Sequence, residues 1–230
     1  MRLAPFTIAT TALLAGPVFI AVPQFTGLPM HGAAYAQSQT ELSLNAQLLV
    51  AARNDDIPNF RRMLDEGAAV NSRNRNGDTP LIIFTRKGNA DLVKLLIDKG
   101  ADVNLRNVDK VSPLMGAAYS GNAEIAKMLL EKGADVSAVD QLGKTAMVYA
   151  AGQGNAEIVG LLIDAGVEVN QTYKHNLTAL MWAAGYGRSA AVELLLVRGA
   201  DAGMLDDRGK TAFEIATEAG HKDAAGLLAP

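Results

Sequence analysis

Residues 77–104 read GDTPLIIFTRKGNADLVKLLIDKGADVN, and this stretch decides the fold because its landmarks recur along the chain. The glycine before its Ala-Asp-Val-Asn end returns at a constant spacing, at Gly67, Gly100, Gly133, Gly166 and Gly199. Two further series share the period: Gly88, Gly121, Gly154, Gly187 and Gly220, and the hydroxyl residues Thr79, Ser112, Thr145, Thr178 and Thr211. Paired apolar residues keep the same register, from Leu95-Leu96 to Leu227-Leu228. Four coincident series indicate an array of one repeated unit.

The residues of the unit predict two short helices. Thr79-Pro80 has the form of an N-cap followed by a first-turn proline, and Gly88 suits the left-handed residue that ends a helix. Asn89, Asn122 and Asn155 are expected to cap a second helix that runs to the next series glycine. Neither helix is long enough to be stable alone in water, so each unit must bury its apolar face against its neighbours.

This pattern resembles the ankyrin repeat, through Gly77-Asp-Thr-Pro-Leu81, Lys99-Gly-Ala-Asp-Val-Asn104 and Trp182-Ala-Ala. The resemblance covers Ser43 to Pro230. It implies an all-α solenoid of about six helix–turn–helix–loop units, each of about 33 residues. We place the units at about 43–74, 75–107, 108–140, 141–173, 174–206 and 207–230. Charged or polar residues at both ends are typical of capping repeats.

The sequence departs from the ankyrin pattern at two positions. The histidine of Thr-Pro-Leu-His is replaced throughout, by Ile82, Met115, Val148, Met181 and Glu214, so we expect apolar packing where the histidine network would lie. The loop glycine seen at Gly77, Gly143 and Gly209 is replaced by Lys110 and Asn176. Asparagine tolerates a left-handed conformation, and lysine adopts it less readily.

The N-terminal segment has the features of a secretory signal. Arg2 precedes an apolar run from Leu3 to Val22, and Ala34-Tyr35-Ala36 offers a small-residue cleavage site. We expect a signal peptide at 1–36, a linker at 37–42 and a bacterial periplasmic or secreted protein, whose net charge changes from −3 to −4 on loss of Arg2. The alternative is an uncleaved anchor, because the apolar run is about long enough to span a bilayer.

Composition and motifs give no support for catalysis. The net charge of −3 offers nothing to a nucleic acid, and the absence of cysteine excludes disulfides and thiol chemistry. His175 and His221 have no partners at metal-ligand spacing, and we expect no metal and no cofactor. Tyr149 and Trp182 share one repeat position, which favours core packing for both.

The resemblance therefore implies a protein-binding module, expected to be monomeric, that meets its partner through the concave face of loop tips and first helices. The candidate partner-binding residues are Arg75, Asn76, Asp78, Arg86, Lys87, Val108, Asp109, Val111, Tyr119, Gln141, Leu142, Lys144, Gln153, Lys174, His175, Leu177, Tyr186 and Arg208. Among these, the apolar and aromatic residues are expected to face water, and Tyr119 and Tyr186 to hold one repeat position before the inter-helix glycine.

The kind of partner stays open at the level of sequence. The array could stabilise a periplasmic enzyme, or inhibit a toxic one as an immunity protein does. An enzyme or ligand carrier is the alternative of another class, and it would need a convergent polar cluster that the sequence does not reveal.

Overall fold

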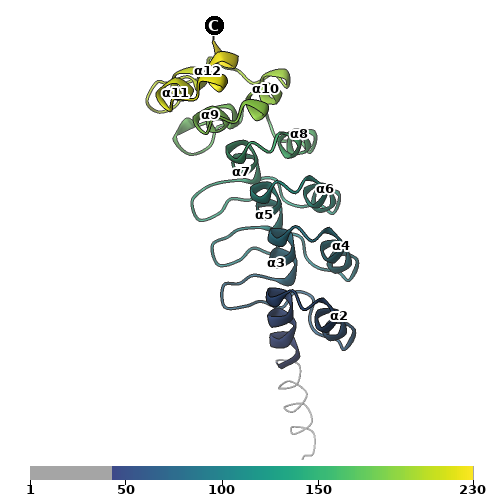
Figure 1. Cartoon of the computed structure of the whole chain (residues 1–230). Coiled ribbons are helices and arrows are strands. Elements are labelled where there is room, and N and C mark those ends of the chain that lie inside the picture. Colours follow the sequence, from purple (N-terminus) through teal and green to yellow (C-terminus); the bar gives the residue numbers. More distant parts are fainter. Residues whose placement is uncertain (1–42, 230) are drawn as a thin grey trace, which may run out of the picture. The chain divides into compact units, whose positions relative to one another are not determined.

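The computed structural model describes residues 43–229, and the predicted signal peptide and linker lie outside the described residues. All regular elements of the described part are helical (Figure 1). A helical stretch at 43–54 is followed by α2 (Ile57–Asp65), α3 (Pro80–Lys87), α4 (Ala90–Asp98), α5 (Pro113–Ser120), α6 (Ala123–Glu131), α7 (Ala146–Gln153), α8 (Ala156–Asp164), the 3-10 turn η1 (Lys174–Asn176), α9 (Ala179–Gly185), α10 (Ser189–Val197), α11 (Ala212–Glu218) and α12 (Lys222–Leu228). These helices form successive helix–turn–helix pairs, which confirms the predicted all-α ankyrin solenoid.

The helices lie in two rows. Helices α3, α5, α7, α9 and α11 pack on one another and form the first row, whereas α4, α6, α8, α10 and α12 form the second row. In Figure 1 the long loops that precede α3, α5 and α7 extend beyond the first row, on the side opposite α4, α6 and α8. The first row is therefore accessible from the side of the loops.

Small residues in the first row let the helices approach closely. The alanine pairs inside α5, α7 and α9 are fully buried, and so are the leucines that the second row directs between the rows: Ala117-Ala118, Ala150-Ala151 and Ala183-Ala184, with Leu129, Leu162 and Leu195. Close packing of this kind repeats from one unit to the next, so one continuous core runs between the rows.

The helix caps follow the sequence prediction with one exception. Each hydroxyl of the Thr79 series accepts a hydrogen bond from the third residue of its helix, and Gly88, Gly121 and Gly154 are left-handed. Asn89 and Asn122 cap α4 and α6 as expected. The prediction for Asn155 is wrong, because its side chain makes no cap and its Nδ2 donates instead to the Ala118 carbonyl at 2.7 Å. Asn155 thus joins two repeats rather than capping one.

The missing histidine is replaced by apolar packing, as expected. Ile82, Met115, Val148 and Met181 are buried, and the sulfurs of Met115 and Met181 accept from the backbone N–H of their N-cap residues at 3.5 and 3.4 Å. Glu214 is the exception, since its side chain is exposed and its carboxylate accepts from both N–H and O–H of Thr211.

In most loops, an Asn or Asp side chain at one repeat position accepts hydrogen bonds from the backbone of the same loop. Asn74, Asp140 and Asp206 each accept, through Oδ1, from the backbone N–H groups two and four residues later. Asn107 accepts in the same way from Val111 at 2.9 Å. This acceptor lets the chain turn sharply with its loop N–H groups satisfied.

The loop at Lys110 keeps the regular turn although it lacks the loop glycine. Lys110 has φ +60° and keeps the turn that Asn107 organises, so lysine takes the place of the loop glycine. The fifth loop departs instead, because Tyr173 stands where the other loops have Asn or Asp. Without that acceptor the loop forms η1, and His175 and Asn176 are both left-handed, with φ +63° and +53°.

Candidate functional site

The candidate site is the first-helix face, which we define as the accessible side of α3, α5, α7 and α9 with the loop tips at 75–78, 108–111, 141–144, 174–177 and 207–210. Most predicted binding residues are exposed there: Arg75, Asn76, Arg86, Lys87, Val108, Asp109, Tyr119, Gln141, Leu142, Gln153, Lys174, His175, Tyr186 and Arg208. Lys144 is half-buried. The loop tips are tied together by backbone hydrogen bonds, such as the one from Val108 N–H to the Asn76 carbonyl at 2.9 Å. The repeats therefore present these residues on one connected surface.

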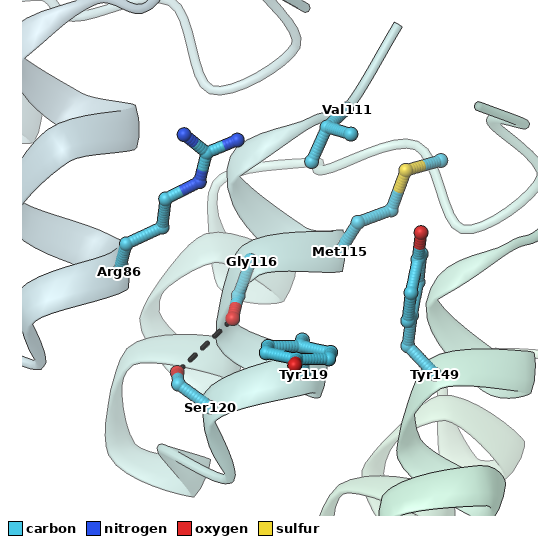
Figure 2. Close-up of a pocket in the computed structure, with 7 residues that line it drawn as sticks. All are labelled: Arg86, Val111, Met115, Gly116, Tyr119, Ser120 and Tyr149. Atoms are coloured by element: carbon cyan, nitrogen blue, oxygen red, sulfur yellow. Dashed lines mark hydrogen bonds between the residues drawn. The ribbon is translucent and has the colours of Figure 1, made fainter. Parts of the chain in front are cut away.

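A pocket of about 390 Å³ lies on this face across three repeats (Figure 2). Figure 2 shows Arg86 of α3 on one side, the ring of Tyr149 of α7 on the other, and Tyr119 of α5 between them. Gly116 forms part of the wall, and a Cβ there would meet the stem of Arg86 at 3.6 Å. The absence of a side chain at Gly116 therefore leaves room between the large residues of neighbouring repeats.

Polar groups in this pocket are fixed by buried carboxylates. The Tyr149 hydroxyl donates to Oδ2 of the buried Asp140 at 2.6 Å. Burial and this hydrogen bond raise the pKa of Tyr149 well above its usual value, so the phenol stays neutral. Arg86 pairs with the buried Asp78 at 3.2 Å and extends its guanidinium towards the pocket. The pocket thus combines aromatic walls with a cation at its edge.

Lys144 connects this pocket to a second one, of about 300 Å³, in the fourth and fifth repeats. Its ammonium lies 5.6 Å from the ring centroid of Tyr149 and 5.2 Å from that of Trp182, which are cation–π distances. Trp182 stacks in turn on Tyr186, with 6.0 Å between the centroids and 9° between the planes. Tyr119 meets Tyr149 edge-on at 5.9 Å. Four aromatic side chains and one lysine therefore run continuously along the face.

Three details of the predicted site need correction. Asp78 is buried, where it accepts from Arg86 and from Asn107 Nδ2 at 3.0 Å, so it supports the loops rather than forming part of the surface. Val111 and Leu177 are half-buried against the core instead of facing water. Tyr119 and Tyr186 do not share a repeat position, because a whole number of repeats does not separate them and Tyr186 corresponds to Ser120.

The prediction of core packing for Tyr149 and Trp182 is confirmed in part, because both side chains pack against the buried residues of the core. Both are only half-buried, however, and Tyr149 lines the first pocket and Trp182 the second. A signal was present in the sequence, since the same repeat position holds Ile83, Gly116 and Ile215 in other units. A position that accepts both glycine and tryptophan is not constrained by a closely packed core.

Residues 43–229 contain no group of three or more His, Asp or Glu side chains placed to hold a metal ion. Within the same described range, no helix has both the length and the apolar character needed to cross a bilayer.

Stacked helix–turn–helix pairs with a constant period, joined by loops that carry the exposed residues, define a repeat scaffold. A family model described as "Ankyrin repeats (3 copies)" matches residues 48–140 and 147–230, and the chain belongs to the ankyrin-repeat family. No curated protein matches the sequence. Ankyrin repeats typically serve as binding scaffolds rather than enzymes, which indicates a protein-binding module.

Proposed function

We propose that this protein binds another protein through the first-helix face, and that it does so in a bacterial periplasm or after secretion. The main evidence for this binding surface is that large apolar side chains are exposed on that face. Val108, Tyr119, Leu142 and Tyr186 are 56, 60, 65 and 51% exposed, respectively. Clustered apolar side chains in contact with water are typical of interfaces.

Tyrosine supports this proposal because it gives a large contact area and a hydrogen-bonding tip while losing little conformational entropy. Tyr119 and Tyr186 lie at the two ends of the aromatic row and each contacts only one ring of its neighbours, Tyr149 and Trp182. Their outer faces are free to be covered by a partner. Truncation of both should therefore affect binding far more than folding.

The experiment is affinity capture from an extract of the source organism with the chain 37–230 as bait. The bait is used in three forms: wild type, Tyr119→Ala/Tyr186→Ala and Val197→Ala. Val197 is the matched control, because it is 77% exposed but lies on α10 in the second row. A protein retained by the wild type and by Val197→Ala but lost from the tyrosine variant supports the proposed surface. Equal retention by all three excludes it.

The proposed compartment is tested separately. Cleavage after Ala36 leaves Gln37 as the first residue, whereas an uncleaved anchor retains the apolar segment 3–22. Mass spectrometry of the N-terminus of the native protein, purified from the periplasmic fraction, distinguishes the two. Recovery of the chain only in the membrane fraction, with residues 1–36 present, would contradict the proposal.

A further inference from the structure

Two lysines at one repeat position differ in their charge partners. Lys210 pairs with Glu218 in the last repeat. Lys144 is its equivalent two repeats earlier and pairs with no carboxylate among residues 43–229. The residue equivalent to Glu218 is Gly152, so the chain provides an acid for one lysine and none for the other. The Lys144 ammonium is therefore a positive charge whose partner is absent from the described part of the chain.

The position of Lys144 is fixed even without a counter-ion. Cation–π contacts to Tyr149 and Trp182 hold its ammonium between two rings. The nearby carboxylate of Asp140 is already engaged, since its Oδ1 accepts from two backbone N–H groups and its Oδ2 accepts from Tyr149. A cation placed in advance loses little entropy when it binds an anion.

The pocket beside Lys144 suits an acid on an apolar stem. Its walls include Leu142, which is 65% exposed, and the ring of Trp182. Lys174 and His175 add positive or protonatable groups at the loop side. The acid Asp207 lies next to His175, with 3.4 Å between Oδ2 and Nδ1, and forms no ion pair with Lys144. The charge of this pocket is complementary to an acidic segment.

We propose that Lys144 is the docking point for a glutamate or aspartate side chain in an extended segment of the partner protein. The carboxylate pairs with the Lys144 ammonium, and the methylene stem and an adjacent apolar residue lie against Trp182 and Leu142. This inference rests on the proposed protein-binding function and specifies the chemistry that the first-helix face recognises.

The test uses random peptides displayed inside a loop of a carrier protein, so that no peptide offers a free C-terminal carboxylate. They are selected on wild-type chain, Lys144→Met, Lys144→Arg and Lys210→Met. Methionine keeps the apolar stem and removes the charge, and Lys210→Met is the control at the same repeat position. Selected peptides are then titrated in solution, with the fluorescence of Trp182, the only tryptophan of the chain, as a local signal.

The expected result is enrichment of peptides with Asp or Glu next to an apolar residue by the wild type, Lys144→Arg and Lys210→Met. Lys144→Met should lose this enrichment and bind the selected peptide about tenfold or more weakly, while it stays folded with only a small fall in melting temperature from the lost cation–π contacts. Enrichment of basic or uncharged peptides, or equal affinity of Lys144→Met and wild type for the selected peptide, overturns the inference.

Comparing Lys144→Met with the tyrosine variant Tyr119→Ala/Tyr186→Ala distinguishes a failure of this inference from a failure of the proposed function. A native partner that the tyrosine variant loses but Lys144→Met retains would overturn the carboxylate docking point and leave the binding surface in place. A native partner retained by the tyrosine variant would exclude the proposed surface, whatever the peptides show.

Discussion

The two rows of helices use their exposed sides differently. Helices α5, α7 and α9 of the first row contain no charged residue, whereas α4, α6 and α8 of the second row each contain at least two. Some of these charges form ion pairs at the surface: Lys94 with Asp98 at 2.6 Å, Lys99 with Asp65 of α2 at 3.0 Å, and Arg198 with Asp164 at 2.7 Å. The second row thus presents mainly charged side chains to water, whereas the first row presents aromatic rings and Lys144.

In each repeat, the second-row helix therefore contributes mainly to stability, whereas the first-row helix carries the surface proposed for binding. Surface ion pairs of this kind add little stability. The stability comes from the leucines that the second row buries beneath them. Substitutions in the two rows should therefore have different consequences, and the predictions below run from the largest effect to the smallest.

The largest effect is expected from the buried side of the second row. Leu129 of α6 is fully buried, so Leu129→Ala removes apolar contact and leaves a cavity, at a cost of about 3 kcal/mol. Tyr119→Ala in the neighbouring α5 removes a side chain that is 60% exposed and one edge-on contact, at a cost of about 1 kcal/mol. Urea denaturation of both variants measures the difference. Equal losses would mean that Tyr119 belongs to the core and would remove the distinction between the rows.

The second effect concerns two glycines that share a backbone conformation but not an environment. Gly121 and Gly133 have φ +75° and +79°, so alanine costs about 1 kcal/mol at each. At Gly121 the new Cβ would lie 2.7 Å from Asn155 Oδ1, and it would displace the hydrogen bond from Asn155 to the Ala118 carbonyl. At Gly133 no atom lies within 4 Å of such a Cβ.

Gly121→Ala should therefore lower the free energy of unfolding by about 2 kcal/mol, or roughly twice the loss in Gly133→Ala. Thermal and urea denaturation of the two variants under one set of conditions provide the comparison. A larger loss in Gly133→Ala would show that the contact between Asn155 and the preceding repeat contributes nothing.

The repeat period was enough to predict the helices, their caps and the family. Each hydroxyl of the Thr79 series and each glycine of the Gly88 series acts within a few residues of its own position, so local rules suffice. Asn155 shows the limit of those rules, because its Nδ2 donates to a carbonyl 37 residues away while its side chain does not cap its own helix. Contacts between repeats cannot be obtained from the pattern of a single repeat.

The same limit explains the errors in the candidate site. Asp78 is polar and next to a loop glycine, so the sequence favours an exposed side chain. In the structure it is buried, where it accepts a hydrogen bond from Asn107 of the next repeat. The row formed by Tyr149, Lys144 and Trp182 spans two repeats, and its order depends on how they stack. The unusual fifth loop could have been predicted, since Tyr173 breaks an otherwise regular series of Asn and Asp.

A third prediction concerns the hydrogen bond between Tyr149 of the first-helix face and the buried Asp140. Tyr149→Phe removes the hydroxyl that donates to Asp140 Oδ2 and leaves the ring in place. Asp140 is only 6% exposed, so one carboxylate oxygen loses its partner, and the free energy of unfolding should fall by about 1 kcal/mol. Chemical denaturation gives the value, and unchanged stability would mean that water replaces the hydroxyl at no cost.

The smallest effect is expected at an exposed acid in the last helix of the first row. Helix α11 carries Glu214, whose carboxylate accepts from the N–H and O–H of Thr211 and so closes a capping box. The backbone hydrogen bond first, and then that from the hydroxyl, hold the pKa of Glu214 below its usual 4.5. The carboxylate is favoured in the folded chain, so its contribution to stability is present above pH 4.5 and is lost as the pH falls through the lowered folded-state pKa.

Glu214→Gln isolates this contribution. The glutamine amide oxygen can accept from Thr211 at any pH, so the variant keeps the cap but does not titrate. Between pH 6 and about pH 3, the melting temperature of the wild type should fall further than that of Glu214→Gln, because every other carboxylate is common to both chains. Melting curves at a series of pH values measure the difference. Parallel curves would show that the Thr211 contacts do not favour the charged form of Glu214, and that the exposed acid of α11 behaves like the solvated acids of the second row.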